Sequence, residues 1–271
     1  MIKALQARIE SIKGVKCFGD WVRIDGVLYP LPLVDGNDKI GDVWHASTLP
    51  TDEIVTADYN GGVISEKGTC PITCKDEGGC VTCYGTKGNY NYESTKFYLI
   101  MRTRFLRQHR DIYFKVARFQ IEAQKINMIR LHATGDFIPG EAAGWYEIFK
   151  DYPQLIGWTY TKCAIKGDIE KLNSLSNFNI VPSCVPGFGF NYGHISYVLK
   201  VWAALKRAGK KVYICRCGID KKQHCDNCTA CSVNDYVLFI EHSTAYKAVK
   251  DRLYNFIKMV INAQPQQLRQ L

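Results

Sequence analysis

The feature that most constrains the fold is the alternation of short apolar runs with helix-forming runs in the second half of the chain. Apolar runs with the length of buried strands occupy residues 126–133, 155–162, 178–184, 210–217 and 236–242. The segments between them have the spacing of amphipathic helices, and a last helix is predicted over 243–263. Strands that alternate with helices form βα units around a parallel sheet. We therefore predict an α/β fold with a partial (βα) barrel-like parallel sheet.

The first 60 residues follow another pattern, which predicts a helix and β-hairpins. Residues 1–16 have the pattern of a short amphipathic helix, and Asp25-Gly26 and Asp35-Gly36 are turn signals between apolar runs. Residues 93–125 contain no Gly or Pro, so one or two long helices are expected there. We divide the chain into an N-terminal helix and β-hairpin extension (1–60) and a βα domain (61–265).

Composition favours a chain that stays in a reducing compartment. No run of about 18 apolar residues is present, and the N-terminus lacks a secretory signal, so we expect no membrane span and a cytoplasmic location. Disulfides are unfavourable there, so the twelve cysteines favour metal binding or catalysis. The net charge of +9 favours nucleic acid as a partner, the alternative being a role in solubility alone.

The first cysteine cluster, residues 70–83, supplies Cys70, Cys74, Cys80 and Cys83. The two glycines between the second and third cysteine would allow a tight turn, so that all four thiols reach one metal ion or cluster. Three ligands would leave one iron of a 4Fe–4S cluster open for a substrate or S-adenosylmethionine. Four ligands would close the site. The spacing leaves both arrangements open.

The second cysteine cluster, residues 215–231, contains Cys225, Cys228 and Cys231 at the close triple spacing of a ferredoxin-type 4Fe–4S site. Cys215 or Cys217 would supply the fourth thiolate. Zinc is the alternative metal, because these two cysteines and two of the triple would make a tetrahedral site. The chain is thus expected to carry one or two iron–sulfur clusters in two cysteine-rich metal loops.

Polar side chains gather where the predicted strands end. In parallel sheets functional residues collect at the carboxyl ends of the strands. The residues at these positions are Thr134, Gly135, Asp136, Phe137, Thr159, Thr161, Lys162, Ser183, Cys184, Cys215, Cys217, Glu241 and His242. This set predicts an active site. Cys17 and Cys163, in contrast, are expected to be buried apolar side chains rather than ligands.

Several separated segments resemble one known family in their order along the chain. They are TCP at 69–71, CVTCYG at 80–85, IRLHATGDF at 129–137, LIGWTYTK at 155–162, CDNCTAC at 225–231 and VLFIEH at 237–242. In this order they resemble the phage gene product 88 family. The resemblance implies a phage or mobile-element protein that works in the host cytoplasm. It also implies a distant relation to radical-SAM proteins, whose βα domain carries cysteines before its first long helix.

The resemblance implies roles for single residues as well. Cys70, Cys80 and Cys83 match the family's cysteines, whereas Cys74 is an addition that bears on whether an iron stays open. Thr134, Gly135 and Asp136 match its strand-end element and would bind S-adenosylmethionine. Gly135 would allow a close backbone approach, and Asp136 would accept a hydrogen bond from the ammonium group. Lys162 would bind a carboxylate or phosphate, so Asp136 and Lys162 are the candidate catalytic residues.

Structural roles compete with these assignments. Asp136 would also serve as the cap of a helix that begins near Pro139, and Lys162 as a solvated loop lysine. Arg130 and His132 alternate with apolar residues, so we expect them to share one face of their strand. That face would be the lumen of a barrel, or His132 would be a core histidine with its hydrogen bonds satisfied.

Two functions fit these observations. The first is a radical-SAM-like iron–sulfur enzyme of phage origin that requires an electron donor. The second is a non-enzymatic protein, stabilised by zinc or a structural cluster, that binds nucleic acid through the aromatic and basic stretch 90–110. The aromatic residues of that stretch have helical spacing, which also fits a core role. The two functions combine in an enzyme that acts on a nucleic acid or nucleotide.

Overall fold

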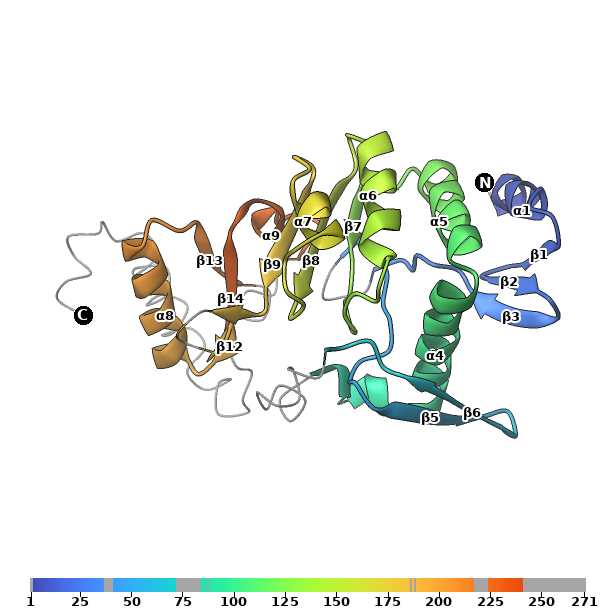
Figure 1. Cartoon of the computed structure of the whole chain (residues 1–271), viewed down its shortest axis with the longest axis horizontal. Helices are drawn as coiled ribbons and strands as arrows, with labels where there is room; N and C mark the ends of the chain where they lie inside the picture. The colour runs from blue at the N-terminus through green and yellow to red at the C-terminus, as the bar shows by residue number, and fades with distance from the viewer. Residues whose placement is uncertain are drawn as a thin grey trace.

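The computed structural model describes residues 2–36, 41–71, 84–86, 88–185, 187, 189–216 and 224–240, and in them the βα units form two parallel sheets (Figure 1). The larger sheet has the order β4-β7-β8-β9, formed by Trp44–His45, Met128–Arg130, Ile156–Thr161 and Phe178–Pro182. The smaller sheet has the order β12-β14-β13, formed by Tyr192–Gly193, Tyr236–Ile240 and Val212–Ile214. All pairs within both sheets are parallel.

The predicted α/β class and its parallel strands are confirmed. The five predicted strands correspond to β7, β8, β9, β13 and β14. Their βα units do not close into a barrel within the described residues: β9 contacts β14, but the two strands belong to separate sheets. The carboxyl ends of the strands therefore line the ends of two open sheets and not the mouth of a closed barrel.

Helices α6 (Glu141–Asp151) and α7 (Asp168–Asn173) cover one face of the larger sheet, α5 (Arg110–Gln124) packs beside α6, and α8 (Ile195–Arg207) packs on the smaller sheet. The expected helical region 93–125 forms two helices, α4 (Glu93–Gln108) and α5. They meet at His109, whose backbone leaves the helical conformation (φ −133°, ψ 47°). α6 follows β7, α7 follows β8, and α8 precedes β13.

The two faces of the larger sheet are buried against different partners. On the helix face, Ile129 and Phe178 join Phe149 of α6 in the main core, which also includes α1 and α5. On the opposite face, Trp158 and Val181 pack with residues of the second cysteine cluster and with β14. The alternation of side chains along each strand produces these two faces.

The N-terminal region confirms the predicted helix and hairpin. α1 (Ile2–Glu10) packs on an antiparallel sheet of β1 (Val15–Phe18), β2 (Trp21–Ile24) and β3 (Val27–Pro30). Asp25 and Gly26 both have positive φ (49° and 83°), as the tight β2–β3 turn requires. Asp35-Gly36 is not a two-residue hairpin turn, because Val34 pairs with His45.

A second hairpin is formed by β5 (Ile54–Tyr59) and β6 (Gly62–Lys67), although residues 62–67 carry few strand-forming apolar side chains. Its turn contains the expected domain boundary at residues 60–61. The remaining elements are short: η1 (Tyr84–Thr86), η2 (Gly88–Asn91), β10 (Cys184–Val185), β11 (Gly189–Phe190) and α9 (Ala230–Val233). No helix in the described residues combines the length and apolar content needed to cross a membrane. The helix predicted over 243–263 lies outside those residues.

Candidate functional site

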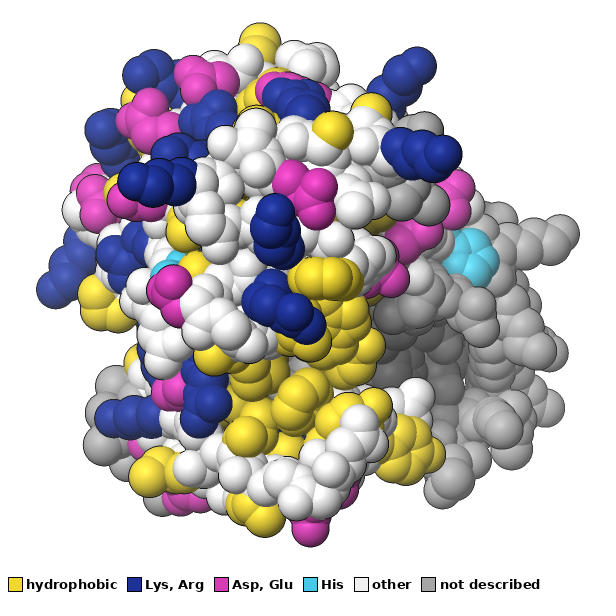
Figure 2. All heavy atoms as spheres, turned by 90° about the vertical axis from the view of Figure 1, so that its right-hand side faces the viewer, with side chains coloured by type: hydrophobic (Ala, Val, Ile, Leu, Met, Phe, Trp, Pro, Cys, Tyr) yellow, Lys and Arg dark blue, Asp and Glu magenta, His cyan; other side chains and the backbone are white. Residues whose placement is uncertain are grey.

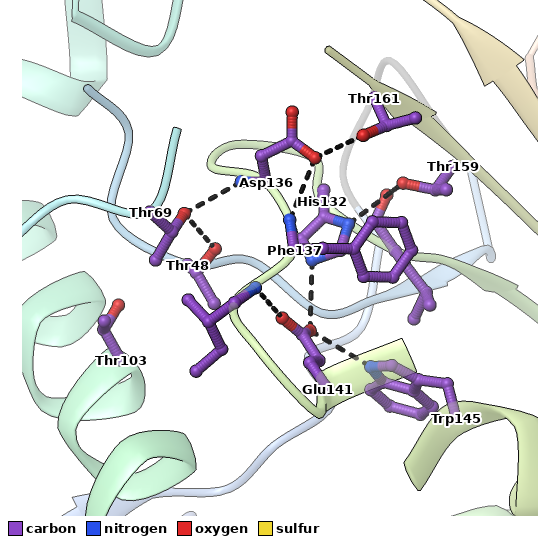
Figure 3. A network of polar contacts seen from close by, with 12 residues as sticks. Thr48, Thr69, Thr103, His132, Asp136, Phe137, Glu141, Trp145, Thr159 and Thr161 are labelled. Carbon is purple, nitrogen blue, oxygen red and sulfur yellow. Dashed lines mark hydrogen bonds and ion pairs between the residues drawn. The ribbon is translucent and has the colours of Figure 1, made fainter. Parts of the chain in front are cut away.

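As predicted, the Thr134–Asp136 turn follows β7 at the carboxyl ends of the strands of the larger sheet, which we call the carboxyl edge. Thr48 and Thr69 hold the turn there. Figure 3 shows the contacts among Thr48, Thr69 and Asp136. Thr134 and Thr48 exchange hydrogen bonds: the Thr134 hydroxyl donates to the Thr48 carbonyl (2.9 Å), and the Thr48 amide donates to the Thr134 carbonyl (3.1 Å). Gly135 has φ 82°, and a Cβ there would lie 2.1 Å from Thr48 Oγ1 and 2.7 Å from Thr69 Oγ1. Only glycine fits this turn without displacing its neighbours.

The Asp136 carboxylate joins the ends of β7 and β8. It is buried and accepts hydrogen bonds from the Thr161 hydroxyl (2.5 Å), the Lys162 amide (2.8 Å) and the Phe137 amide (2.9 Å). The Cys163 thiol is also hydrogen-bonded to this carboxylate, so protein donors occupy its four or so acceptor positions. Asp136 does not cap α6, because the N-cap position of that helix belongs to Gly140.

The same edge receives the beginning of the first cysteine cluster. Thr69 Oγ1 accepts a hydrogen bond from the Asp136 amide (2.8 Å) and lies 3.0 Å from Thr48 Oγ1. The amide of the next residue, Cys70, donates to the Thr51 carbonyl (3.0 Å). The first cysteine of the loop is therefore fixed beside the Thr134–Asp136 turn. The other three cysteines of this loop, Cys74, Cys80 and Cys83, lie outside the described residues.

Lys162 and Cys163 follow β8 at this edge. The contact that Lys162 makes with Asp136 is through its backbone amide. The Cys163 amide donates to Thr161 Oγ1 (2.9 Å), and its side chain packs against the main core. Burial, and after it the charge of Asp136, raises the pKa of the Cys163 thiol to about 12. Cys17 is buried in the core, as expected, whereas Cys163 is a protonated thiol that is only partly buried and makes polar contacts.

A buried histidine–glutamate pair supports the edge from the helix side. His132 is 4% exposed, and Glu141, the first residue of α6, is 1% exposed. His132 Nε2 lies 3.0 Å from Glu141 Oε1, and its Nδ1 lies 3.0 Å from Thr159 Oγ1. Glu141 also accepts hydrogen bonds from Trp145 Nε1 (3.2 Å) and the Ile138 amide (3.1 Å). These contacts appear together in Figure 3.

The hydrogen-bond pattern indicates that His132 is an imidazolium. The single proton of the Thr159 hydroxyl is directed to the Leu131 carbonyl (3.1 Å), so this hydroxyl accepts from Nδ1–H. The Glu141 carboxylate accepts from Nε2–H. Burial lowers the pKa of His132. The charge and hydrogen bond of Glu141, together with the charge of Asp136, raise this pKa by more than burial lowers it, so the net shift is upward. His132 is therefore a satisfied core residue with a buried ion-pair partner.

The expectation that Arg130 and His132 share one face is wrong. β7 ends at Arg130, and His132 has a left-handed backbone (φ 50°) that breaks the alternation of the strand. The His132 side chain therefore contacts α6, whereas Arg130 lies over the Tyr160 ring (5.4 Å to its centroid). Tyr160 in turn packs against the second cysteine cluster.

The second cysteine cluster gathers on the face of the larger sheet opposite α6. The Tyr160 hydroxyl donates to Cys231 Sγ (2.8 Å). Burial raises the pKa of the Cys231 thiol to about 12, with further upward effects from Cys215 and Cys225. Cys228 is hydrogen-bonded to the side chain of Tyr213 on β13. Four cysteines from two separate segments thus meet in one region.

Two further contacts hold this region against the sheet. The Asn179 side-chain amide on β9 donates to the carbonyls of Cys231 (2.7 Å) and Asn234 (2.9 Å), at the two ends of the short helix α9.

Among the described residues, no three His, Cys, Asp or Glu side chains are arranged to hold a metal ion. Three other predicted residues, Cys217, Glu241 and His242, fall outside the described ranges. The ligand assignments therefore stay predictions.

Comparison with known proteins gives one match. The family model described as gene product 88 matches residues 33–234, more than half of the chain. The chain belongs to the gene product 88 family. This membership supports a phage origin and agrees with the resemblance found in the sequence. No curated protein and no solved structure gives a significant match.

The region that the family model matches begins before β4 and ends after α9, so it contains the larger sheet together with β12 and β13, while β14 follows it. It also contains residues that sequence reasoning missed. Thr48 and Thr69 are distant in sequence from the turn that they contact, and Glu141 resembles an ordinary first-turn acidic residue of a helix. The one signal for Glu141 was its position nine residues after His132, close behind the predicted strand 126–133.

Proposed function

We propose that this protein is an iron–sulfur enzyme with two metal centres. Cys70, Cys80 and Cys83 would hold a 4Fe–4S cluster at the carboxyl edge of the larger sheet. Cys215 or Cys217 with Cys225, Cys228 and Cys231 would hold the second centre. S-adenosylmethionine is the proposed cofactor of the first cluster. The observation that carries the proposal is the hydrogen bond from the Asp136 amide to Thr69 Oγ1.

That bond brings two elements of the sequence together. It joins the residue before Cys70 to the Thr134–Asp136 turn, although they are 67 residues apart. Parallel sheets gather their functional residues at this edge. The turn offers a close backbone approach at Gly135 and the negative charge of Asp136. Both features suit a cofactor that carries an ammonium group.

The second centre is supported by the chemistry of its donors. Thiolates are the ligands of iron–sulfur clusters and of closed zinc sites. The four described cysteines lie in one region, where Arg130 and the Tyr160 hydroxyl lower the pKa of the Cys231 thiol against the effect of burial. A positive charge and a hydrogen-bond donor beside a thiolate stabilise its charged, metal-binding form. We assign this centre a structural or electron-transfer role.

The residues at the edge would bind and orient rather than react. Asp136, fixed by hydrogen bonds from the protein, would attract an ammonium group through its charge. The Thr48–Thr69–Thr134 hydrogen bonds hold the cysteine loop against the turn. When bound and reduced by an external one-electron donor, a 4Fe–4S cluster supplies the electron that cleaves the carbon–sulfur bond of S-adenosylmethionine.

The test uses protein purified without oxygen and three single variants. Cys70→Ala is expected to lose the first cluster and Cys225→Ala the second, which is about four irons each. Cys17→Ala, which removes a buried core thiol, is the matched control and should keep the metal content of the wild type. Equal metal content in all three variants would contradict the ligand assignment.

The cofactor is tested in the Cys225→Ala variant, because its remaining cluster is the first one. Adding S-adenosylmethionine to the reduced protein is expected to change the electron paramagnetic resonance spectrum of that cluster. An unchanged spectrum would remove the S-adenosylmethionine proposal and leave an electron-transfer or structural role. Zinc without labile sulfide in the wild type would overturn the iron–sulfur proposal in favour of two zinc sites.

A further inference from the structure

The outer face of the N-terminal sheet is uncovered. The inner side chains of β1 and β2, such as Val15 and Val22, are buried in the main core. The outer side chains include Phe18, which is 48% exposed, and Leu28, which is 38% exposed. Lys16 pairs with Arg23 across the strands, and Phe18 pairs with Trp21. We call the set Lys16, Phe18, Trp21, Arg23, Leu28 and Tyr98 the aromatic–basic face.

Aromatic rings extend this face from the sheet onto α4. The Trp21 ring lies 4.8 Å from the Tyr98 ring, centroid to centroid, and Tyr98 is 37% exposed. Trp21 also contacts Phe97 (6.3 Å), which stacks near Tyr59 of β5 (4.7 Å). Figure 2 shows the side of the molecule that carries this sheet, where hydrophobic side chains form a patch bordered by Lys and Arg side chains.

The charges of the face are positive. Lys16 and Arg23 are exposed and form no ion pair with a described residue. The Arg23 guanidinium lies over the Phe18 ring (4.5 Å to its centroid), which holds the cation beside an exposed aromatic surface. The outward positions of the three strands carry no carboxylate, and the nearest ones in sequence, Asp20 and Asp25, lie in the turns. The face therefore favours an anionic partner with planar groups.

The stretch 90–110, expected to bind nucleic acid, is less suited to it. Phe105 is fully buried, and Arg102 is 5% exposed and donates to the Leu31 carbonyl. Arg104 and Arg107 are both occupied by Glu66. The aromatic residue of α4 that is exposed beside the sheet is Tyr98, next to Trp21. The available cations and rings thus belong mainly to β1 and β2.

We propose that the aromatic–basic face binds single-stranded nucleic acid. Bases would stack on Phe18, Trp21 and Tyr98, and Lys16 and Arg23 would contact the phosphates. Aromatic rings beside cations on an open surface are the features that single-strand-binding proteins use, because every base has a π-face. This site is independent of the metal centres, since the face lies on the N-terminal sheet.

The test measures binding of the full-length protein to a fluorescent 15-nucleotide single strand by anisotropy at several salt concentrations. Two phosphate contacts predict a slope of about −1.4 for log K against log salt. Phe18→Leu, which keeps the apolar volume but removes the ring, is expected to weaken binding about tenfold, while Phe18→Tyr retains it. Lys16→Glu with Arg23→Glu should weaken binding further and flatten the salt slope.

Two comparisons keep the proposal falsifiable. Lys206→Glu with Arg207→Glu makes the same charge change at the exposed end of α8, at the other end of the molecule (Figure 1), and should bind nearly as the wild type does. Equal loss in both double variants would mean that net charge alone drives binding, which overturns the site. Wild-type affinity in Phe18→Leu would overturn stacking. A concentration-dependent dimer that only the face variants abolish, without binding to the strand, would assign the face to a second copy of the chain instead.

Discussion

The buried His132–Glu141 pair makes the sharpest structural prediction. In Glu141→Gln, the charge that His132 faces is removed while the shape of the side chain is retained. Glu141 is 1% exposed and accepts hydrogen bonds from His132, Trp145 and Ile138. Breaking a buried ion pair on one side costs about 3–5 kcal/mol, because the other charge is left buried without a partner.

The pH dependence identifies the mechanism. The folded pKa of His132 is raised above its ordinary value of 6.5, so the pair stabilises the fold fully below that pH. This contribution is lost as the pH rises through the folded pKa. A single proton changes the free energy of unfolding by at most about 1.4 kcal/mol per pH unit. In Glu141→Gln, burial dominates the pKa of His132, so the loss of stability on raising the pH should be absent.

Urea unfolding between pH 6 and pH 9 measures both effects. We expect the stability difference between the wild type and Glu141→Gln to be largest at pH 6 and to shrink as the pH rises. The matched control is Glu147→Gln, on the same helix, whose carboxylate is half exposed and pairs with Lys150. It should cost less than about 1 kcal/mol. A wild-type-minus-Glu141→Gln difference that is constant from pH 6 to pH 9 would refute the imidazolium assignment.

Three further predictions concern single side chains. Gly135→Ala is expected to lower the melting temperature far more than Gly26→Ala. A Cβ at Gly135 would lie 2.1 Å from a side-chain oxygen, whereas Gly26, with nearly the same φ, faces open space. Equal losses of melting temperature would mean that backbone strain alone matters. Because the pKa of its thiol is raised to about 12, Cys163 should resist iodoacetamide in the native protein at pH 8, and mass spectrometry that finds it alkylated as fast as in urea would contradict this. Tyr160→Phe removes the hydroxyl that donates to Cys231 Sγ. It should speed the loss of metal from the proposed second centre to a chelator several-fold without unfolding the protein. An unchanged rate would show that this hydrogen bond does not support that centre.

The parts of the fold with local signals were predictable. Apolar strands flanked by amphipathic helices gave the parallel sheet, and Asp25-Gly26 gave the β2–β3 turn. Barrel closure has no local signal, since it depends on whether β9 and the later strands share hydrogen bonds. The β6 strand was missed because it is largely exposed and its partner β5, rather than its own apolar content, defines it.

The candidate site was predictable only as far as strand ends reveal it. Thr134, Gly135 and Asp136 follow a buried strand and were found for that reason. Thr161 and Lys162, which contact Asp136, end the next predicted strand and were found in the same way. Thr69 was not, because it reaches Asp136 only through tertiary structure. The face of His132 was predicted wrongly because simple alternation does not anticipate a left-handed residue at a strand end. In this conformation the His132 ring contacts Glu141 and Thr159, which are nine and 27 residues away in the sequence.

The most direct test of the account is the iron, acid-labile sulfide and zinc content of the wild-type protein purified without oxygen. The account predicts iron and sulfide in about equal amounts, about eight of each per chain if both centres are 4Fe–4S clusters, with broad absorbance near 400 nm. A chain that contains stoichiometric zinc and no sulfide, or no metal at all, would contradict the proposed iron–sulfur function.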